Sequence, residues 1–323
     1  MSHIQIPKGW ELPESDVTLE SVFLNRRDFL KAAGFLGAAT VALSGCAPGD
    51  PEVLAHRPEV TWTPLDKTLY PAQRNLHYKI DRKVTAPKVA GNFNNYYEFS
   101  ETKEDVNHHA RALPTQNWTL EVEGLVNKPQ TFGMEDLLKL MPLEERFYRM
   151  RCVEAWAMVV PWTGFPLKAL LDKVEPQSSA KYVEFSSFYM PFTAQGQLAF
   201  WQPWPYSEVL SIQEAMNELT MMATGIYGHP LPKQHGAPLR LVVPWKYGFK
   251  SIKAVASIRL TDYGPPTFWN TVMPSEYGYI ANVNPNVPHP RWAQNKEKML
   301  GTGEVRYTKM HNGYGDFVSD LYT

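Results

Sequence analysis

A single cysteine in a charged setting most constrains what this chain can become. The sequence has 2 cysteines, and Cys46 lies at the end of a segment typical of an export signal. Cys152 is then the only thiol in the folded body, and in an oxidising compartment it has no disulfide partner within the domain. Such a thiol is a buried small hydrophobe, a nucleophile or a metal ligand, and all three interpretations stay open. Arg149 and Arg151 favour the thiolate that the last two roles need, and Glu154 adds a further charge.

Residues 1–46 are predicted to be a signal region. Arg26 and Arg27 precede a mildly apolar run over residues 32–45, which is too short to span a bilayer. Paired arginines before such a run indicate the twin-arginine export route. The alternative is a basic pair that opens an ordinary alanine-rich helix. The twin-arginine route carries folded proteins, so it favours a periplasmic enzyme whose cofactor is inserted in the cytoplasm.

The end of the signal carries a second prediction. Leu43-Ser44-Gly45-Cys46 resembles a lipobox, in which Cys46 is lipidated and becomes the first mature residue. Two acyl chains would then hold the enzyme at a membrane face. The competing interpretation is ordinary cleavage near Ala47, and the sequence does not decide between them. Residues 47–87 are rich in proline and predict an extended lead-in to a body formed by residues 88–323.

Composition excludes several classes of protein. The 32 Lys and Arg residues balance 33 Asp and Glu residues, so nothing indicates a nucleic-acid partner or a basic membrane-surface patch. Roughly 275 residues remain after removal of the signal, enough for one large domain or two small ones. Aromatic residues make up 13% of the chain, and the 27 prolines outnumber the 20 glycines. This mixture favours a loop-rich α+β enzyme over a helical bundle.

The sequence also lacks the motifs of the common redox centres. It contains no C-x-x-C-H haem motif, no cysteine cluster for an iron–sulfur centre and no G-x-G-x-x-G fingerprint for a dinucleotide. Any redox chemistry therefore requires an external electron partner.

Periodicity predicts a mixture of strands and helices. Alternating apolar and polar residues predict strands at 118–124, 146–153, 182–189 and 254–261, and the second of these delivers Cys152. Amphipathic patterns predict helices at 134–141, 166–174 and 207–223. Pro142 ends the first helix, and Pro166 stands at the favoured first turn of the second. Residues 162–166 predict a turn, and the chain after Thr261 is interpreted as irregular and aromatic.

Two stretches carry polar side chains suited to a ligand. Residues 91–100 are rich in asparagine, which favours turns and whose amides can bind a polar ring edge. In residues 235–253, Arg240 offers a planar bidentate clamp for a phosphate and Lys253 a point charge. His235 is ordinarily a hydrogen-bonded structural residue, although a histidine also charges at mildly acid pH.

The run Cys152-Val153-Glu154-Ala155-Trp156 makes the chain resemble the sulfite-oxidase-like molybdenum enzymes. Within them it resembles the reductases that act on methionine sulfoxide in periplasmic proteins, because the Ala-Gly-Asn-Arg that follows the cysteine of sulfite oxidases is absent. The resemblance covers nearly everything after Lys88. It implies an α+β molybdopterin-binding fold with mixed β-sheets and no C-terminal immunoglobulin-like domain. Without that dimerisation domain, a monomer is expected.

The resemblance also implies a site in which Cys152 ligates molybdenum. The residues that match cofactor-contacting positions are Asn94, Tyr97, Glu98, Ser187, His235, Arg240, Ser251, Ile252 and Lys253. Ser187 replaces a threonine and keeps the hydroxyl, and His235 replaces the asparagine usual in the reductases, whereas sulfite oxidases carry His-Gly there. Glu154 is a candidate for proton delivery because its strand parity matches that of Cys152, or it forms an ion pair with a neighbouring arginine.

The implied function is the reduction of methionine sulfoxide in periplasmic proteins, with a molybdenum–molybdopterin cofactor that carries the redox chemistry. The implied electron donor is a membrane subunit with haem b, fed by quinone. Aromatic segments around Trp201–Trp204 and Tyr277–Tyr279 are expected to form an open rim for a protein-bound sulfoxide. One alternative is the same cofactor acting on sulfite or on small S- or N-oxides. Another is a cofactor-free solute-binding lipoprotein with Cys152 as core filler.

Overall fold

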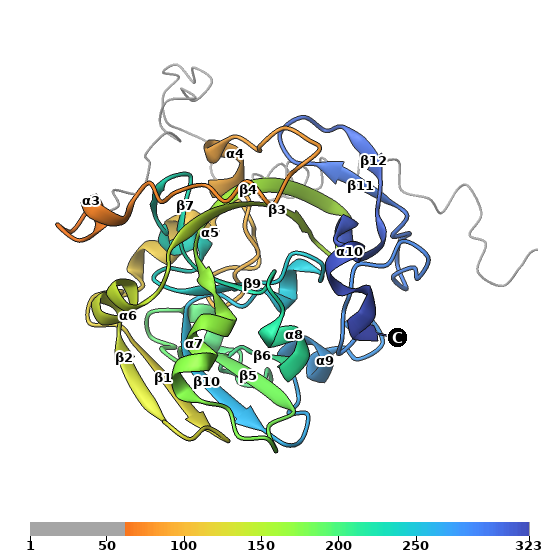
Figure 1. The fold of residues 1–323 in the computed structure, drawn as a ribbon. Coiled ribbons are helices and arrows are strands. Elements are labelled where there is room, and N and C mark those ends of the chain that lie inside the picture. Colours follow the sequence, from red (N-terminus) through yellow and green to blue (C-terminus); the bar gives the residue numbers. More distant parts are fainter. Residues whose placement is uncertain (1–61, 323) are drawn as a thin grey trace, which may run out of the picture. The chain divides into compact units, whose positions relative to one another are not determined.

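Two β-sheets carry the fold of residues 62–322, the part of the chain that this computed structural model describes. Each sheet contains both parallel and antiparallel strand pairs. Figure 1 shows one sheet low in the body and an arch of β3 (Glu144–Arg151) and β4 (Trp156–Pro166) above it. The predicted α+β class with mixed sheets is therefore confirmed.

The five-stranded sheet has the order β2-β1-β10-β5-β6. Its strands are β1 (Thr119–Gly124), β2 (Gln130–Gly133), β5 (Tyr182–Ser187), β6 (Ser207–Ser211) and β10 (Val255–Thr261). β5 alternates between buried and partly accessible residues, as a strand with one face on the core should. The predicted strands at 118–124, 182–189 and 254–261 are confirmed.

The seven-stranded sheet has the order β12-β11-β4-β7-β8, with β3 paired to β4 and β9 paired to β7. Its other strands are β7 (Met221–Ile226), β8 (His229–Pro230), β9 (Arg240–Val242), β11 (Lys296–Met299) and β12 (Val305–Tyr307). β3 and β4 form an antiparallel hairpin, whose last pair at the tip is Arg151 with Ala157. The predicted strand at 146–153 is confirmed, except that it ends one residue before Cys152.

Residues 162–166 continue β4 and do not form the predicted turn. Gly164, which was interpreted as a turn signal, serves close packing instead. A Cβ at this position would lie 2.1 Å from the carbonyl oxygen of Met222 in β7. Glycine thus lets the two backbones approach at the bulge between Thr163 and Gly164.

Residues 207–223 are not one helix, and this prediction was wrong. They form β6, the short helix α8 (Ile212–Met216) and the start of β7. β7 is buried along its whole length, so its apolar run lacks the alternation of a half-exposed strand. Ser211 and Glu214 form a capping box that starts α8, which is a helix start inside the supposed helix.

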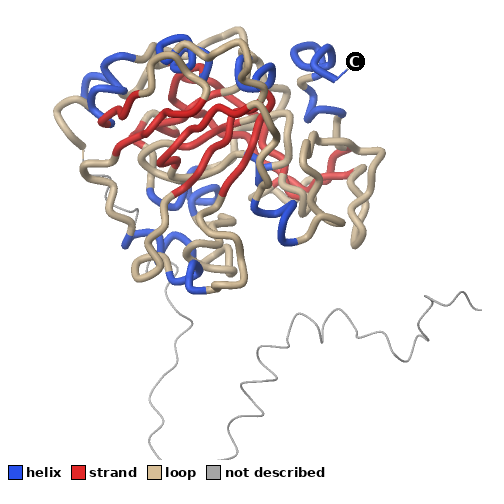
Figure 2. Tube along the Cα trace, turned by 90° about the horizontal axis from the view of Figure 1, so that it is seen from below, coloured by secondary structure: helices blue, strands red, loops and turns tan. Residues whose placement is uncertain are grey.

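The remaining helices are short and lie around the strands, as Figure 2 shows. They are α3 (Asp66–Leu69), α4 (Pro87–Gly91), α5 (Val106–His109), α6 (Met134–Leu140), α7 (Leu167–Val174), α9 (Phe268–Val272) and α10 (Gly315–Val318). Single 3-10 turns occur at Ala110–Ala112, Gln195–Leu198, Lys233–His235, Gly248–Lys250, Met310–Gly313 and Ser319–Tyr322. α6 and α7 confirm two predicted helices. The chain after Thr261 is more regular than expected, because α9, β11, β12 and α10 lie in it.

The described part of the lead-in, from residue 62 to residue 87, packs against the body. The hydroxyl of Tyr70 donates to the Thr224 hydroxyl in β7 at 2.8 Å. The N–H of Thr85 donates to the Val159 carbonyl in β4 at 2.8 Å. The predicted signal and Cys46 lie outside the described residues. Among residues 62–322, no helix has the length and apolar character needed to cross a membrane.

Candidate active site

Cys152 lies at the tip of the β3–β4 hairpin. A turn over residues 152–155 closes with a hydrogen bond from the Cys152 N–H to the Trp156 carbonyl at 2.9 Å, and Ala155 has a φ of 65° in it. Cys152 and Glu154 therefore share a turn, and the argument from strand parity was wrong. Their side chains nevertheless meet, because the Cys152 Sγ lies 3.5 Å from Glu154 Oε2.

Buried polar side chains anchor the backbone of this turn. The guanidinium of Arg151, which is 0% exposed, donates to the Cys152 carbonyl and, at 2.9 Å, to Gln294 Oε1. The side chains of Trp292 and Gln294 both donate to the Val153 carbonyl at 2.8 Å. These hydrogen bonds hold the carbonyls of Cys152 and Val153, and they therefore fix the backbone that carries the cysteine.

The arginines beside Cys152 do not activate its sulfur as expected. Arg149 pairs with Asp81 at 3.0 Å, and Arg151 is used by the turn. Burial, together with the charge of Glu154, raises the pKa of Cys152 to about 12. A thiol in this state is protonated at neutral pH and is a poor nucleophile, whereas a bound metal ion displaces such a proton. The surroundings therefore favour a ligand over a free nucleophile.

Glu154 lies at the centre of a hydrogen-bonded cluster. Its carboxylate accepts from Asn95 Nδ2 at 3.0 Å, from Lys103 Nζ at 3.0 Å and from Trp156 Nε1 at 3.1 Å. Burial acts to raise the pKa of Glu154, but these three hydrogen bonds outweigh it and lower the pKa. Its ion-pair partner is thus Lys103 and not the expected arginine. An ionised carboxylate with three donors is better suited to positioning its neighbours than to delivering a proton.

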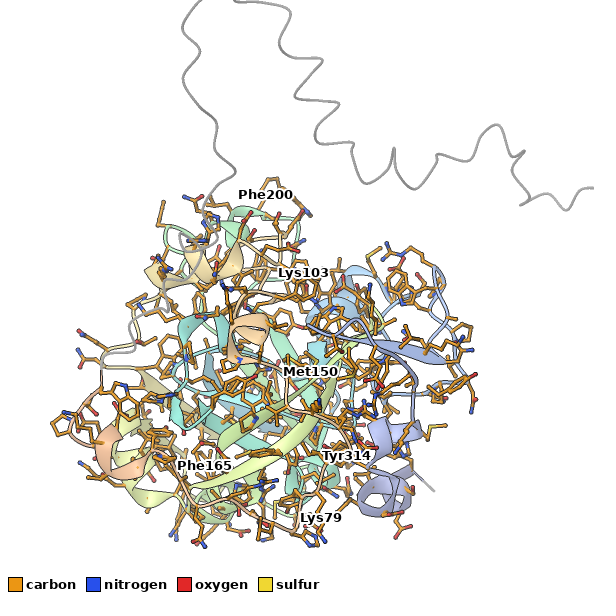
Figure 3. The ribbon with its side chains drawn as sticks, turned by 90° about the horizontal axis from the view of Figure 1, so that it is seen from above. Lys79, Lys103, Met150, Phe165, Phe200 and Tyr314 are labelled. Atoms are coloured by element: carbon orange, nitrogen blue, oxygen red, sulfur yellow. The ribbon has the colours of Figure 1, made fainter. Side chains whose placement is uncertain are left out.

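A cavity of about 880 Å³, its open mouth included, lies beside the turn. Three parts of the chain line it, at residues 93–98, 150–158 and 235–253. Trp269 and Tyr277, stacked with 4.8 Å between their ring centroids, form a further wall. Figure 3 shows Met150, one of the lining residues, well inside the body.

Two cations line this cavity without a salt bridge to a carboxylate among residues 62–322: Arg240 is buried, and Lys253 is partly buried. The guanidinium of Arg240 donates to the carbonyls of His235, at 3.0 Å, and Ser251, at 2.9 Å. The ammonium of Lys253 donates to the Asn95 carbonyl at 2.5 Å. Carbonyl dipoles orient these groups but do not neutralise them, so an anion in the cavity would complete the arrangement.

Burial shifts the pKa values of the titratable side chains that line the cavity. Burial lowers the pKa of Arg240 to about 10, and burial together with the charge of Arg240 lowers the pKa of Lys253 to about 7. Burial also raises the pKa of Glu98 to about 7. For His235, burial and the two neighbouring cations lower the pKa to about 3. The expectation that His235 charges at mildly acid pH is therefore wrong, and it presents one donor and one acceptor nitrogen.

Two buried polar atoms of the loop at 93–98 lack a hydrogen-bond partner in the described structure. They are Asn95 Oδ1 and the hydroxyl of Tyr96, and both residues line the cavity. Such atoms are unfavourable when unpaired, so they mark places where a ligand or a water molecule completes the bonding. Asn94, Tyr97 and Glu98 lie on the same loop and line the same cavity.

Comparison with known proteins identifies the family. The model of the oxidoreductase molybdopterin binding domain matches residues 107–269. The chain belongs to the molybdopterin-binding oxidoreductases. It is 46% identical, over 97% of its length and 94% of the relative's, to the protein-methionine-sulfoxide reductase catalytic subunit MsrP of Burkholderia mallei. Among solved structures, the sulfane dehydrogenase SoxCD from Paracoccus pantotrophus matches with a TM-score of 0.42 and 17% identity, over 71% of this chain and 59% of that chain.

The cavity fits the cofactor of this oxidoreductase family. Among residues 62–322, no three His, Cys, Asp or Glu side chains gather into a metal-binding group. The Cys152 thiol faces the cavity and would be the sulfur ligand to a metal carried by the molybdopterin. The cofactor's phosphate needs cations, and its pterin needs donors and acceptors. Arg240 and Lys253 supply the first, and the unpartnered atoms of Asn95 and Tyr96 are among the second.

The structure brings together every predicted site residue except Ser187. The hydroxyl of Ser187 donates instead to the carbonyls of Lys253, at 3.0 Å, and Ala254, at 3.1 Å. It therefore supports the loop that carries Lys253 and does not itself line the cavity. The roles of the lining residues toward the cofactor remain predictions.

The sequence reasoning missed three residues of the cluster around Glu154. Asn95 lies within the asparagine-rich loop, and Trp156 closes the motif that carried the family resemblance, so both had a local signal. Lys103 lies in a charged run, Glu101-Thr-Lys-Glu-Asp105, which looks like any solvated loop. Only the tertiary structure shows that this lysine reaches Glu154.

Proposed function

We propose that this chain is a molybdenum-dependent reductase of methionine sulfoxide residues in periplasmic proteins. The observation that carries the proposal is the 46% identity with the reductase catalytic subunit over nearly the whole of both chains. The cavity supports it, because a buried thiol and two unpaired cations face one space suited to molybdopterin. Membership of the family sets aside the cofactor-free lipoprotein.

We assign the cofactor-holding roles as follows. Arg240 and Lys253 bind the phosphate, because they are the cations that line the cavity and form no salt bridge in the described part of the chain. The pterin contacts the polar and apolar groups contributed by Asn94, Tyr97, Glu98, His235, Ser251 and Ile252. Cys152 provides the protein's sulfur ligand to molybdenum. When bound, the cofactor supplies two-electron oxygen transfer.

The reaction converts a sulfoxide, two electrons and two protons into a thioether and water. The protein's own contribution is to hold the substrate at the mouth. The rings of Trp269, Tyr277 and Phe93, which line the cavity, suit the apolar arm of a methionine. Glu154 accepts hydrogen bonds from Asn95 and Lys103 and so holds the Asn95 amide beside the Cys152 sulfur. The protons come from solvent at the open mouth.

The electrons come from outside the chain, since no second redox motif occurs in the sequence. We propose a membrane subunit with haem b, fed by quinone, as the donor to a monomeric catalytic subunit. We also propose export to the periplasm through Arg26 and Arg27. Lipidation at Cys46 would add a membrane anchor, and mass spectrometry of the mature N-terminus decides between lipidation and simple cleavage.

The decisive assay supplies loaded enzyme with a reduced viologen dye and an oxidised, unfolded protein. We expect methionine to be regenerated, as measured by mass. A second arm supplies sulfite with an artificial electron acceptor. Turnover of sulfite without any reduction of the oxidised protein would move the chain to oxidation of sulfite and leave only the cofactor assignment.

Replacing the predicted ligand gives the strongest single-residue test. Cys152→Ser should abolish turnover, because a neutral hydroxyl is a poor replacement for a thiolate ligand. The matched control is Cys46→Ser, which removes the other cysteine of the chain and should leave the turnover of purified enzyme unchanged. Normal turnover by the Cys152 variant would refute its assignment as the metal ligand.

A further inference from the structure

Residues 189–201, here called the aromatic loop, expose a cluster of large apolar side chains. They are Tyr189, Phe192, Leu198, Phe200 and Trp201, with 59%, 96%, 56%, 89% and 73% of their surface exposed. The rings of Phe200 and Trp201 meet edge to face with 5.4 Å between centroids. Figure 3 shows Phe200 at the edge of the body. Neighbouring exposed apolar side chains of this size mark an interaction surface.

The aromatic loop is held firmly from beneath. Ala194 is fully buried and Gln197 is 1% exposed. The amide of Gln197 donates to the Phe188 carbonyl at 2.7 Å and accepts from the Met190 N–H at 2.7 Å. Buried residues of the loop therefore anchor its backbone, while its aromatic side chains stay exposed to solvent.

The loop rests directly on the wall of the active-site cavity. The N–H of Gly196 donates to the Glu98 carbonyl at 2.9 Å. A Cβ on Gly196 would lie 1.9 Å from the Tyr97 carbonyl oxygen, so only glycine permits this approach. Tyr97 and Glu98 both line the cavity. The loop is therefore packed directly against the segment that forms one wall of the cavity.

A second contact joins the loop region to the cavity. Tyr277 stacks on Trp269, Trp269 contacts Phe268 at 5.3 Å, and Phe268 contacts Trp204 at 4.7 Å. These rings form an arc from the cavity wall to the residues just after the loop. The expected aromatic rim is thus divided, because Tyr277 lines the cavity whereas Trp201 is exposed and does not line it.

The aromatic loop and its flanking residues carry no charged side chain, which limits the kind of partner that can bind to the loop. No Asp, Glu, Lys, Arg or His occurs between Glu184 and Glu208. Segments that dock on anionic membranes add lysine or arginine to their apolar residues, and this one has none. An apolar, uncharged polypeptide matches the surface better than either a membrane or a charged partner.

We propose that the aromatic loop binds the apolar residues that flank an oxidised methionine in an unfolded substrate protein. This inference rests on the proposed function, since it takes the substrate to be a protein-bound sulfoxide. Methionine and its neighbours are usually buried, so they become available together when a protein unfolds. Aromatic faces bind such segments with little dependence on sequence, which suits an enzyme that acts on many proteins.

The test compares Phe192→Ser/Phe200→Ser/Trp201→Ser with wild-type holoenzyme. The probe is a synthetic peptide with a central methionine sulfoxide flanked by Val, Leu and Ala, and its binding is measured without an electron donor. We expect the dissociation constant and the KM to rise about tenfold, the loss usual when aromatic anchors are truncated. The kcat for the peptide and the turnover of dimethyl sulfoxide, which has no flanks, should not change.

The matched control is Tyr263→Ser. Tyr263 is 56% exposed and follows β10 at the end opposite Lys253, so its loss should change neither constant. Equal molybdenum content and melting temperature establish that each variant is folded. If the triple variant does not fold, Phe192→Ser alone replaces it, since that side chain is 96% exposed.

Two outcomes would count against the proposal, and a third would count against the proposed function alone. Unchanged peptide binding in the variant overturns it while leaving the reductase function intact. Binding of wild-type enzyme to phosphatidylglycerol vesicles, lost in the variant while peptide constants stay the same, assigns the loop to a membrane. If wild-type enzyme binds the peptide but reduces no sulfoxide of any kind, the proposed function fails, and the binding measurement still decides what the loop does.

Discussion

Between residues 240 and 253 the chain carries three buried cations and one partly buried cation, Lys253, and it surrounds them in two different ways. Lys246 pairs with Glu214 at 2.5 Å, and Lys250 pairs with Glu208 at 2.6 Å. In both pairs the two side chains are at most 9% exposed. These cations are neutralised within the fold, so they need no ligand.

The two cations at the ends of this stretch differ. Arg240 and Lys253 line the cavity, form no salt bridge within the described residues, donate hydrogen bonds to backbone carbonyls and lie over aromatic rings. Lys253 is also attracted by the charge of Glu98. Burying a charge without a counter-charge is unfavourable, so a protein keeps it only where function requires it. Lys246 and Lys250 thus stabilise the fold through ion pairs, whereas Arg240 and Lys253 are available to bind an anionic ligand. The substitutions below change either an ion pair of the first two lysines or one of the two cavity cations.

The largest effect is expected when a structural pair is broken. Glu208→Gln leaves the ammonium of Lys250 buried without its counter-charge, and the loss of one partner of a buried pair costs roughly 3–5 kcal/mol of stability. The fall in unfolding free energy is measurable by denaturant titration. Glu123→Gln is the control, because its contact with Arg259 is 3.9 Å long and exposed, and such pairs are worth about 0–1 kcal/mol. Equal losses in the two variants would remove the distinction.

The sequence predicted most of the strands but not how the middle of the chain folds. β1, β5 and β10 each have one face on the core, so the alternation of apolar and polar residues in their sequences predicted them as strands. β7 is buried on both sides, and its apolar run looked helical. The glycine in β4 looked like a turn, because the backbone of β7 that requires it lies 58 residues further on, at Met222.

The candidate site was more predictable than the fold around it, because its residues come from local motifs. Cys152, Arg240 and Lys253 were expected from chemistry and resemblance, and one cavity unites them. The charge states could not be predicted. The two arginines near Cys152 are used elsewhere, and burial keeps His235 neutral, which depends on packing that no local pattern shows.

A smaller effect is expected for the two cavity cations that form no salt bridge in the described structure. It concerns binding of the cofactor and not folding. Arg240→Met removes a clamp for the phosphate, and the loss of charge-assisted hydrogen bonds should lower molybdenum retention about tenfold to a hundredfold. Metal analysis of purified protein measures it. Arg259→Met, which removes an exposed arginine, is the control. Full molybdenum retention by the Arg240 variant would contradict its assignment to the phosphate.

The smallest effect is a dependence on pH at Lys253, in protein made without the cofactor. Burial and Arg240 lower the pKa of Lys253 from 10.5 to about 7, so between these values the unfolded chain binds a proton that the folded chain does not. The unfolding free energy of the wild type should therefore rise with pH in this window, by at most about 1.4 kcal/mol per pH unit.

Lys253→Met removes this contribution, so the stability of the variant relative to wild type should be greatest near pH 7 and decrease toward pH 9. Glu98 acts in the same direction. Its pKa is raised by burial and held down by Lys253, so it rises further once the lysine is gone, and ionising it then costs the variant stability as pH increases. Urea titrations of both proteins at several pH values measure the difference. If that difference stays constant from pH 7 to pH 9, Lys253 is already neutralised within the fold, and it belongs with Lys246 and Lys250 and not with Arg240.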